Sequence, residues 1–198
     1  MYDIIFISNC EGKESVIMFN VKKSITLKLI IINIICFILT VGGMLFSGWF
    51  GNNFRVTVLH LQVWRLLTSM FYHFGLMHLI CNMFSLINIG FAVEAMYGKK
   101  KFLIAYFGTG IVGGLIASFI HFVLGQNILS AGASGAICGL LGLLLGSISG
   151  NFSSKVRTVF LTILPLLIIG IGSGVDNVCH FTCLFLGVIL SKIFKANK

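Results

Sequence analysis

The sequence has little charge and almost no proline. Charged residues make up 10% of its 198 residues, only five residues are acidic, and there is one proline. This scarcity excludes a disordered or linker-rich protein, because such chains are rich in charge and proline. Hydrophobic residues account for 58% of the chain and the mean hydropathy is +1.05, far outside the range of soluble globular domains. We therefore expect an integral, multi-pass membrane protein.

Apolar runs are spread along almost the whole chain. A bilayer core about 30 Å thick needs roughly 20 helical residues, so these runs predict six transmembrane helices, with the fifth marginal in length. The stretch 47–74 is aromatic and mixed in polarity, which is typical of an interfacial loop. The predicted fold class is thus an all-α polytopic membrane protein. The runs cover residues 27–46, 76–96, 102–124, 131–148, 158–171 and 178–194.

The domain organisation follows from these runs. Residues 1–24 are expected to be a short cytosolic N-terminal segment, since they lack the charged start and small-residue cleavage site of a signal peptide. Residues 25–198 are expected to form one membrane domain, with a first loop at about 47–74.

The net charge of +9 does not indicate a nucleic-acid partner, because the basic residues follow the predicted loops. When six spans are threaded, all of the fourteen lysines and arginines except Arg55 and Arg65 fall on one side. The positive-inside rule then places both termini in the cytosol.

The six cysteines predict neither disulfides nor a metal centre. Five of them lie in or beside predicted spans, and no pair has the CxxC spacing of a zinc site. The close pair Cys179 and Cys183 shares one helical face without a second cluster. We expect no metal and no cofactor.

Two polar residues in the run 76–96 share a helical face. His78 and Asn82 stand four residues apart, and Glu94 follows three turns later. Ionisable groups inside a bilayer cost about 2.5–3.5 kcal/mol on insertion scales and usually mark function. The alternative is a structural role, in which each side chain gains about 0.6–2 kcal/mol from hydrogen bonds between helices.

The segment GASGAICGLLG places one hydroxyl among glycines. Gly132 and Gly135 flank Ser134 and leave its hydroxyl and backbone N–H uncovered. The alternative is a small-residue packing face on which Ser134 is only another small residue. The glycines that form one bare ridge along this span are Gly135, Gly139, Gly142 and Gly146.

A histidine near the start of the last run completes a chemical pattern. In DNVCHF, Asp176 and Asn177 are suitable N-caps and His180 follows one turn inside the helix. The predicted topology brings Ser134, His180, His78 and Asn82 to one depth. A nucleophile, a base and two donors indicate acyl transfer, in which a serine hydroxyl needs an imidazole to take its proton and the intermediate needs oxyanion donors.

These motifs together resemble the rhomboid family of intramembrane serine proteases, over nearly the whole chain. Trp64-Arg65 is similar to the family's WR pair, HFGLMHLICN to its HxxxN helix and GASG to its GxSG motif, and the helix with His180 to its last helix. The resemblance implies Ser134 as nucleophile, His180 as base and later acid, and an oxyanion hole of His78, Asn82 and the Ser134 N–H.

The resemblance also implies supporting roles and partners. Glu94 would brace the first loop or the cytosolic half of the bundle, and Trp64-Arg65 would seat the loop in the outer leaflet. The substrates would be transmembrane proteins cut near the outer face of a membrane, which we expect to be a bacterial cell membrane, with lipids as the other partner. The oligomeric state stays open.

The chain departs from the family pattern beside the site. Cys138 stands where relatives usually carry an aromatic ring, and Thr182 and Cys183 stand where small glycine-type residues are usual. We expect a slightly wider helix crossing with the serine–histidine pair intact. Two other functions stay open: a proteolytically inactive rhomboid-like protein that binds transmembrane clients, and a small histidine-dependent transporter.

Overall fold

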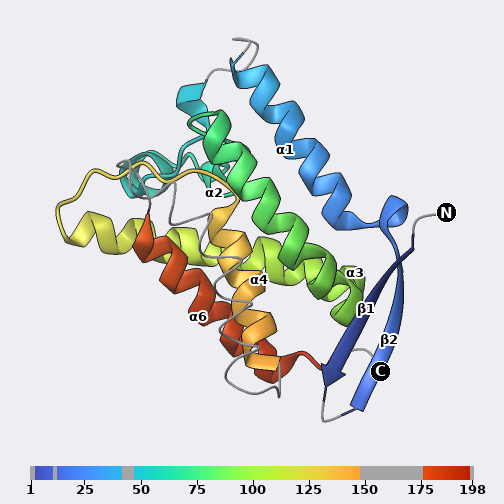
Figure 1. Cartoon of the computed structure of the whole chain (residues 1–198). Coiled ribbons are helices and arrows are strands. Elements are labelled where there is room, and N and C mark those ends of the chain that lie inside the picture. The colour runs from blue at the N-terminus through green and yellow to red at the C-terminus, as the bar shows by residue number, and fades with distance from the viewer. Residues whose placement is uncertain (1–2, 11–12, 42–46, 148–175, 197–198) are drawn as a thin grey trace.

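A computed structural model describes residues 3–10, 13–41, 47–147 and 176–196 (Figure 1). The predicted span 158–171 lies outside the described residues, as do the last residues of the predicted spans 27–46 and 131–148.

Helices dominate the described part of the chain. The long helices are α1 (Ile25–Val41), α3 (Leu76–Val123), α4 (Ser134–Ser147) and α6 (Asn177–Ile193), and α2 (Arg65–Thr68) is a single turn. The sequence predicted helices in all four long segments, and the helical class is confirmed.

Helix α3 consists of two arms that meet at Gly98. Its backbone there is non-helical, with φ 74° and ψ 166°, a conformation that glycine adopts without steric cost. The two arms correspond to the predicted spans 76–96 and 102–124, and Figure 1 shows the chain turning sharply between them. Within the described ranges, α3 is the one helix long and apolar enough by composition to cross a bilayer, while α1, α4 and α6 are shorter apolar helices.

The N-terminal segment forms a hairpin that the sequence did not predict. Strand β1 (Asp3–Cys10) pairs antiparallel with β2 (Lys13–Asn20), from Asp3 opposite Asn20 to Cys10 opposite Lys13. The short helix η1 (Val21–Lys23) follows, and α1 then begins where the Ser24 hydroxyl accepts the Leu27 N–H at 3.0 Å. The all-α expectation is therefore correct for the helical domain but incomplete for residues 3–20.

Helix α4 is buried along nearly its whole length. Its glycines allow this, because a Cβ added at Gly139 would overlap the Thr109 side chain on α3, and one at Gly142 would overlap the Leu184 carbonyl on α6. A Cβ at Gly146 would overlap the hydroxyl of Ser191, also on α6. The ridge predicted from the sequence is thus a close-packing surface, and it contacts two helices.

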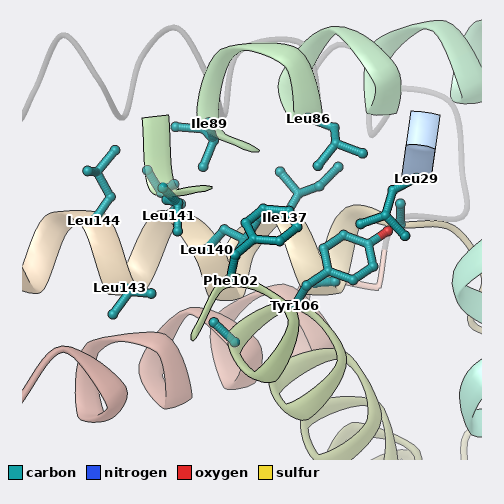
Figure 2. Packing of buried hydrophobic residues seen from close by; sticks show 14 of the residues in the cluster. Leu29, Leu86, Ile89, Phe102, Tyr106, Ile137, Leu140, Leu141, Leu143 and Leu144 are labelled. Atoms are coloured by element: carbon teal, nitrogen blue, oxygen red, sulfur yellow. The ribbon is translucent and has the colours of Figure 1, made fainter. Parts of the chain in front are cut away.

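Apolar side chains fill the space between α4 and both arms of α3. The rings of Phe102 and Tyr106 stack with centroids 6.1 Å apart and both are fully buried. Figure 2 shows Leu86 on the first arm and Ile137 on α4 with these rings in one cluster. This packing fixes the position of α4, and with it the position of Ser134 at the start of that helix.

The first loop contains short helical turns rather than a long helix. These are η2 (Ser47–Trp49), η3 (Arg55–Leu59), α2 and η4 (Ser69–Phe71). Asn52 in this loop pairs with Ser130, just before α4, through two backbone hydrogen bonds of 2.8 Å. The loop is therefore tied to the segment that leads into Ser134.

Candidate active site

Three helices begin at one place in the structure. Ser134 is the first residue of α4, His78 lies in the first turn of α3, and His180 lies in the first turn of α6. The first backbone N–H groups of a helix lack partners within it and carry partial positive charge. A site where three helices begin therefore favours a developing negative charge.

Ser134 and His180 are in hydrogen-bonding contact. The His180 Nε2 atom lies 2.7 Å from the Ser134 Oγ atom, and Ser134 is 8% exposed. The first turn of α6 is capped by Asp176, whose side chain accepts the Cys179 N–H at 2.9 Å. A serine hydroxyl facing an imidazole nitrogen at this distance can pass its proton to that nitrogen.

Gly132 brings the serine segment against His78. Its φ of +105° favours glycine, and its N–H donates to the Ser69 carbonyl at 2.8 Å. A Cβ added at Gly132 would lie 2.7 Å from the His78 Nε2 atom and 3.8 Å from the Asn82 Nδ2 atom. The donors of α3 therefore lie beside the loop two residues before Ser134.

The hydrogen bonds of His78 define which of its nitrogens can donate. The Phe74 N–H points at His78 Nδ1 over 3.4 Å, and the Phe74 ring stacks on the imidazole with centroids 5.9 Å apart. When Nδ1 accepts, the proton of the neutral ring is on Nε2. This is the nitrogen that faces Gly132, so His78 presents an N–H donor to the site.

Asn82 lies one turn further along α3 and is fully buried. Its Nδ2 group donates to the His78 carbonyl at 2.8 Å, which uses one of two amide hydrogens. The Asn82 Oδ1 atom has no hydrogen-bond partner among the described residues. The second amide hydrogen leaves Asn82 with donor capacity next to His78.

The departures from the family pattern pack closely around the serine–histidine pair. Cys138 and Cys183 are buried together, and Cys183 donates to the Thr109 carbonyl at 3.2 Å. A Cβ added at Gly187 on α6 would overlap the Gly139 carbonyl on α4. Helices α4 and α6 thus meet backbone to backbone at this level. The slightly wider crossing expected at Thr182 and Cys183 stays a prediction, because this close contact lies at Gly187.

Trp64, Arg65 and Glu94 were also predicted to have supporting roles. Arg65 is 6% exposed and donates to the Gly51 carbonyl at 2.9 Å and to Gln62 Oε1 at 2.7 Å, which holds the first loop together. Trp64 is 48% exposed. Glu94 accepts hydrogen bonds from Ile25 and Thr26 at the start of α1.

His73 is a residue that the sequence reasoning missed. It is buried, and its ring centroid lies 5.1 Å from that of His78 in an edge-on arrangement. Burial, together with the neighbouring His78 ring, lowers the pKa of His73 to about 3, so the ring is neutral at ordinary pH. The feature of the sequence that could have identified it is its position five residues before His78, in an aromatic stretch.

A second missed group lies around Asp176. Its carboxylate contacts His121 at the end of α3 and Ser130 in the loop before α4. The sequence had given Asp176 only a capping role. In the part of the chain that the structure describes, no group of three or more His, Cys, Asp or Glu side chains could hold a metal ion.

Comparison with known proteins identifies the family of the chain. The model of the rhomboid domain family matches residues 60–197. Over 122 residues the chain is 43% identical to the rhomboid protease GluP of Bacillus subtilis. The aligned region covers 59% of this chain and 23% of GluP. It is 31% identical over 144 residues to rhomboid-like protease 2 of Toxoplasma gondii, covering 70% of this chain and 50% of that protein.

A plant protein extends the set of relatives. RHOMBOID-like protein 6, mitochondrial, of Arabidopsis thaliana is 35% identical over 138 residues, covering 67% of this chain and 44% of that protein. The matched part spans between 23% and 50% of the length of these three relatives. The chain belongs to the rhomboid family, whose members are embedded in membranes.

Proposed function

We propose that the chain is an intramembrane serine endopeptidase that cleaves transmembrane segments through Ser134 and His180. The observation that carries the proposal is the 2.7 Å contact between Ser134 Oγ and His180 Nε2 at the place where α3, α4 and α6 begin. Membership of the rhomboid family, with relatives named as proteases, supports the same function.

The reaction begins with transfer of the Ser134 hydroxyl proton to His180 Nε2. Oγ then forms a bond to the carbonyl carbon of the scissile peptide, and the carbonyl oxygen becomes an oxyanion. The His180 imidazolium returns the proton to the leaving amine as the C–N bond breaks, which leaves an acyl-enzyme. Water attacks the ester carbonyl, again with His180 taking the proton, and Ser134 is released with its hydroxyl restored.

The oxyanion hole would consist of three donors. These are His78 Nε2–H, the free amide hydrogen of Asn82 and the backbone N–H of Ser134, which has no partner within α4 because Ser134 is its first residue. The partial positive charge at the start of each helix adds to these donors. Donors aimed at a charge that forms only in the transition state lower the barrier more than they tighten substrate binding.

The membrane topology belongs to the same proposal. Six spans across a bacterial cell membrane, with both termini in the cytosol, would put the starts of α4 and α6 toward the outer face. The substrates would be membrane proteins whose helices open near that face. Lipid is then the only other partner that the mechanism requires. In this topology, residues 1–24 precede the membrane domain, which spans residues 25–198.

Two other functions would use the same residues differently. An inactive rhomboid-like protein would bind transmembrane clients without cutting them, but such a protein has no need for a serine and an imidazole in contact. A transporter with a proton relay more naturally shows paired repeats and carboxylates at mid-membrane. Glu94 is instead fully engaged at the start of α1.

The test is cleavage of a single-pass transmembrane substrate by the purified chain in detergent. We expect wild type to cleave and Ser134→Ala not to cleave. Ser118→Ala is a matched control, because its hydroxyl bonds only within α3, to the Leu115 carbonyl at 2.9 Å, and this variant should cleave as wild type does. A wild-type chain that binds the substrate without cutting it would favour the inactive client-binding protein instead.

A separate measurement tests the topology. Because all the basic residues except Arg55 and Arg65 fall on one predicted side, tags at both termini should be cytosolic. A C-terminal tag on the outer face would overturn the six-span threading, whatever the outcome of the cleavage assay.

A further inference from the structure

Asp176 has more contacts than a helix cap requires. Its carboxylate is 8% exposed and accepts the Cys179 N–H at 2.9 Å, which is the capping bond. It also contacts His121 Nε2 at 2.8 Å and accepts the hydroxyl of Ser130. These donors come from α6, from the end of α3 and from the loop before α4. A buried carboxylate is costly unless donors satisfy it, and here three segments converge to do so.

The Ser130–Asp176 contact repeats the register of the Ser134–His180 contact. Each pair is separated by 46 residues in the sequence. Ser130 is four residues before Ser134, and Asp176 is four residues before His180. Two side-chain contacts therefore join the segment that leads into α4 to the start of α6. One lies just before the two helices begin, and the other joins the reacting groups.

The Ser130 end of this contact is itself held in place. Its backbone pairs with Asn52 through two hydrogen bonds of 2.8 Å, and the Asn52 side chain donates to the Gly114 carbonyl on α3 at 3.0 Å. The serine-bearing loop is thus anchored to the first loop and to α3. The Asp176 carboxylate, which binds Ser130, is therefore positioned relative to the first loop and α3.

The His121 end ties the second arm of α3 to the same carboxylate. The other ring nitrogen, Nδ1, lies 2.7 Å from Gln126 Oε1, so both nitrogens of His121 face oxygen acceptors. A protonated imidazole has the two N–H donors that this arrangement accommodates. A residue that only capped α6 would need none of these contacts, since a serine caps a helix as well as an aspartate does.

We propose that Asp176 is a positioning residue that fixes the distance and angle between Ser134 and His180 by clamping the start of α6 to Ser130 and His121. Its hydrogen bonds go to Ser130, His121 and the backbone of α6, so the clamp joins the two segments that carry the reacting groups. The inference rests on the proposed proteolytic function. Its effect is on the chemical step, since a displacement of about 1 Å between reacting groups costs about 100-fold in rate.

Three variants separate clamping from capping. Asp176→Ser keeps a capping oxygen but is too short to reach Ser130 and His121 as well. Asp176→Asn keeps the size, the capping oxygen and a polar group toward Ser130, whose hydroxyl can accept as well as donate. Ser130→Ala removes the clamp from the other side and leaves the cap of α6 untouched.

The experiment measures kcat and KM on a single-pass transmembrane substrate, the rate of fluorophosphonate labelling, and Tm, all in detergent. We expect Asp176→Ser and Ser130→Ala to lose about 10–100-fold in kcat and in labelling rate, with KM nearly unchanged. Asp176→Asn should stay within about threefold of wild type. The double variant Asp176→Ser with Ser130→Ala should be no slower than Asp176→Ser alone, because Asp176→Ser already removes the Ser130–Asp176 contact.

Four results would overturn the inference. Full kcat in Asp176→Ser would mean that the cap alone suffices, and losses that multiply in the double variant would mean that the two residues act independently. A loss confined to variants with a lowered Tm would reduce Asp176 to a stability role. A wild-type chain that neither cleaves nor reacts with the probe would remove the proposed function itself, and the inference with it.

Discussion

The Glu94 carboxylate accepts both the backbone N–H and the hydroxyl of Thr26, each at 2.8 Å. Its other oxygen accepts the Ile25 N–H, also at 2.8 Å. A fully buried side chain on α3 thus satisfies the first donors of α1 and fixes where that helix begins. The family resemblance implied that Glu94 braces the first loop or the cytosolic half of the bundle, and these bonds join the first arm of α3 to the start of α1.

Replacing Glu94 by glutamine should destabilise the protein without disabling the site. The amide nitrogen cannot accept, so one or more buried donors lose their partner, at a cost of about 1–3 kcal/mol in the free energy of unfolding. We expect a lower Tm in detergent and near-normal cleavage well below that Tm. Thr26→Val is the matched variant, since it removes only the hydroxyl donor and should lower Tm less. An unchanged Tm in Glu94→Gln would show that these bonds contribute nothing to stability.

Helix positions were predictable because apolar run length and N-cap chemistry are local properties of the sequence. The predicted run 178–194 and the observed α6 (Asn177–Ile193) differ by one residue at each end, and Asp176 caps that helix as expected. The run 131–148 predicted α4 but not its start at Ser134, because Gly132 has a positive φ and is not helical. The glycine ridge was also local information, since its spacing alone places it on one face.

The contacts between loops could not be predicted in the same way. Asn52 and Ser130 lie in polar segments without periodicity, and their pairing depends on how α3 and α4 bring the loops together. The contact between His121 and Asp176 likewise joins the end of one helix to the start of another, 55 residues later. The pairing of residues 3–10 with residues 13–20 depends on the register between the two strands, and a short apolar run does not specify that register.

Gly132→Ala should inactivate the protein. The positive φ at this position is unfavourable for alanine, and the new Cβ would lie 2.7 Å from His78 Nε2. Either His78 or the segment leading to Ser134 must move, and we expect kcat to fall by about 100-fold or more. Gly108→Ala is the control, because a Cβ there meets nothing within 4 Å and should leave kcat unchanged. Normal turnover in Gly132→Ala would show that the loop is adaptable and that its geometry is not critical.

His73 should make the stability of the protein depend on pH. Burial and the nearby His78 ring lower its pKa to about 3 in the folded state, whereas the unfolded chain takes up a proton near pH 6.5. The unfolded state therefore binds more protons as the pH falls from about 6.5 toward 3, and stability is lost over that window. We expect the Tm of wild type to fall more steeply between pH 6.5 and 4.5 than that of His73→Gln. Parallel curves for the two proteins would mean that His73 is accessible to protons in the folded state.

Removing either side-chain donor of the oxyanion hole should slow the chemical step. Alanine at His78 or Asn82 is expected to lower kcat by about 10–1000-fold with a smaller effect on KM, because the donors act on charge that develops in the transition state. Asn88→Ala is the matched control, since Asn88 also bonds back along α3, to the Phe84 carbonyl at 2.8 Å, but is exposed and lies beyond the site. Unchanged turnover in both His78→Ala and Asn82→Ala would return the pair to a structural role. Partial loss at one position is compatible with the proposal, because the Ser134 N–H still contributes.

The nucleophile should be Ser134 and not Cys138, although a thiolate is intrinsically the better nucleophile. Cys138 lies one turn further along α4, about 5.4 Å away along the axis, and is buried against Cys183. The Nε2 atom of His180 is already within 2.7 Å of Ser134 Oγ, so the base faces the serine.

A fluorophosphonate probe should therefore label wild type and Cys138→Ala, and should fail on Ser134→Ala and His180→Ala. Cleavage of a transmembrane substrate should follow the same order, since Cys138 acts only as packing between α4 and α6. If Ser134→Ala kept its activity while Cys138→Ala lost it, the thiol would be the nucleophile and the contact between Ser134 and His180 would have only a structural meaning.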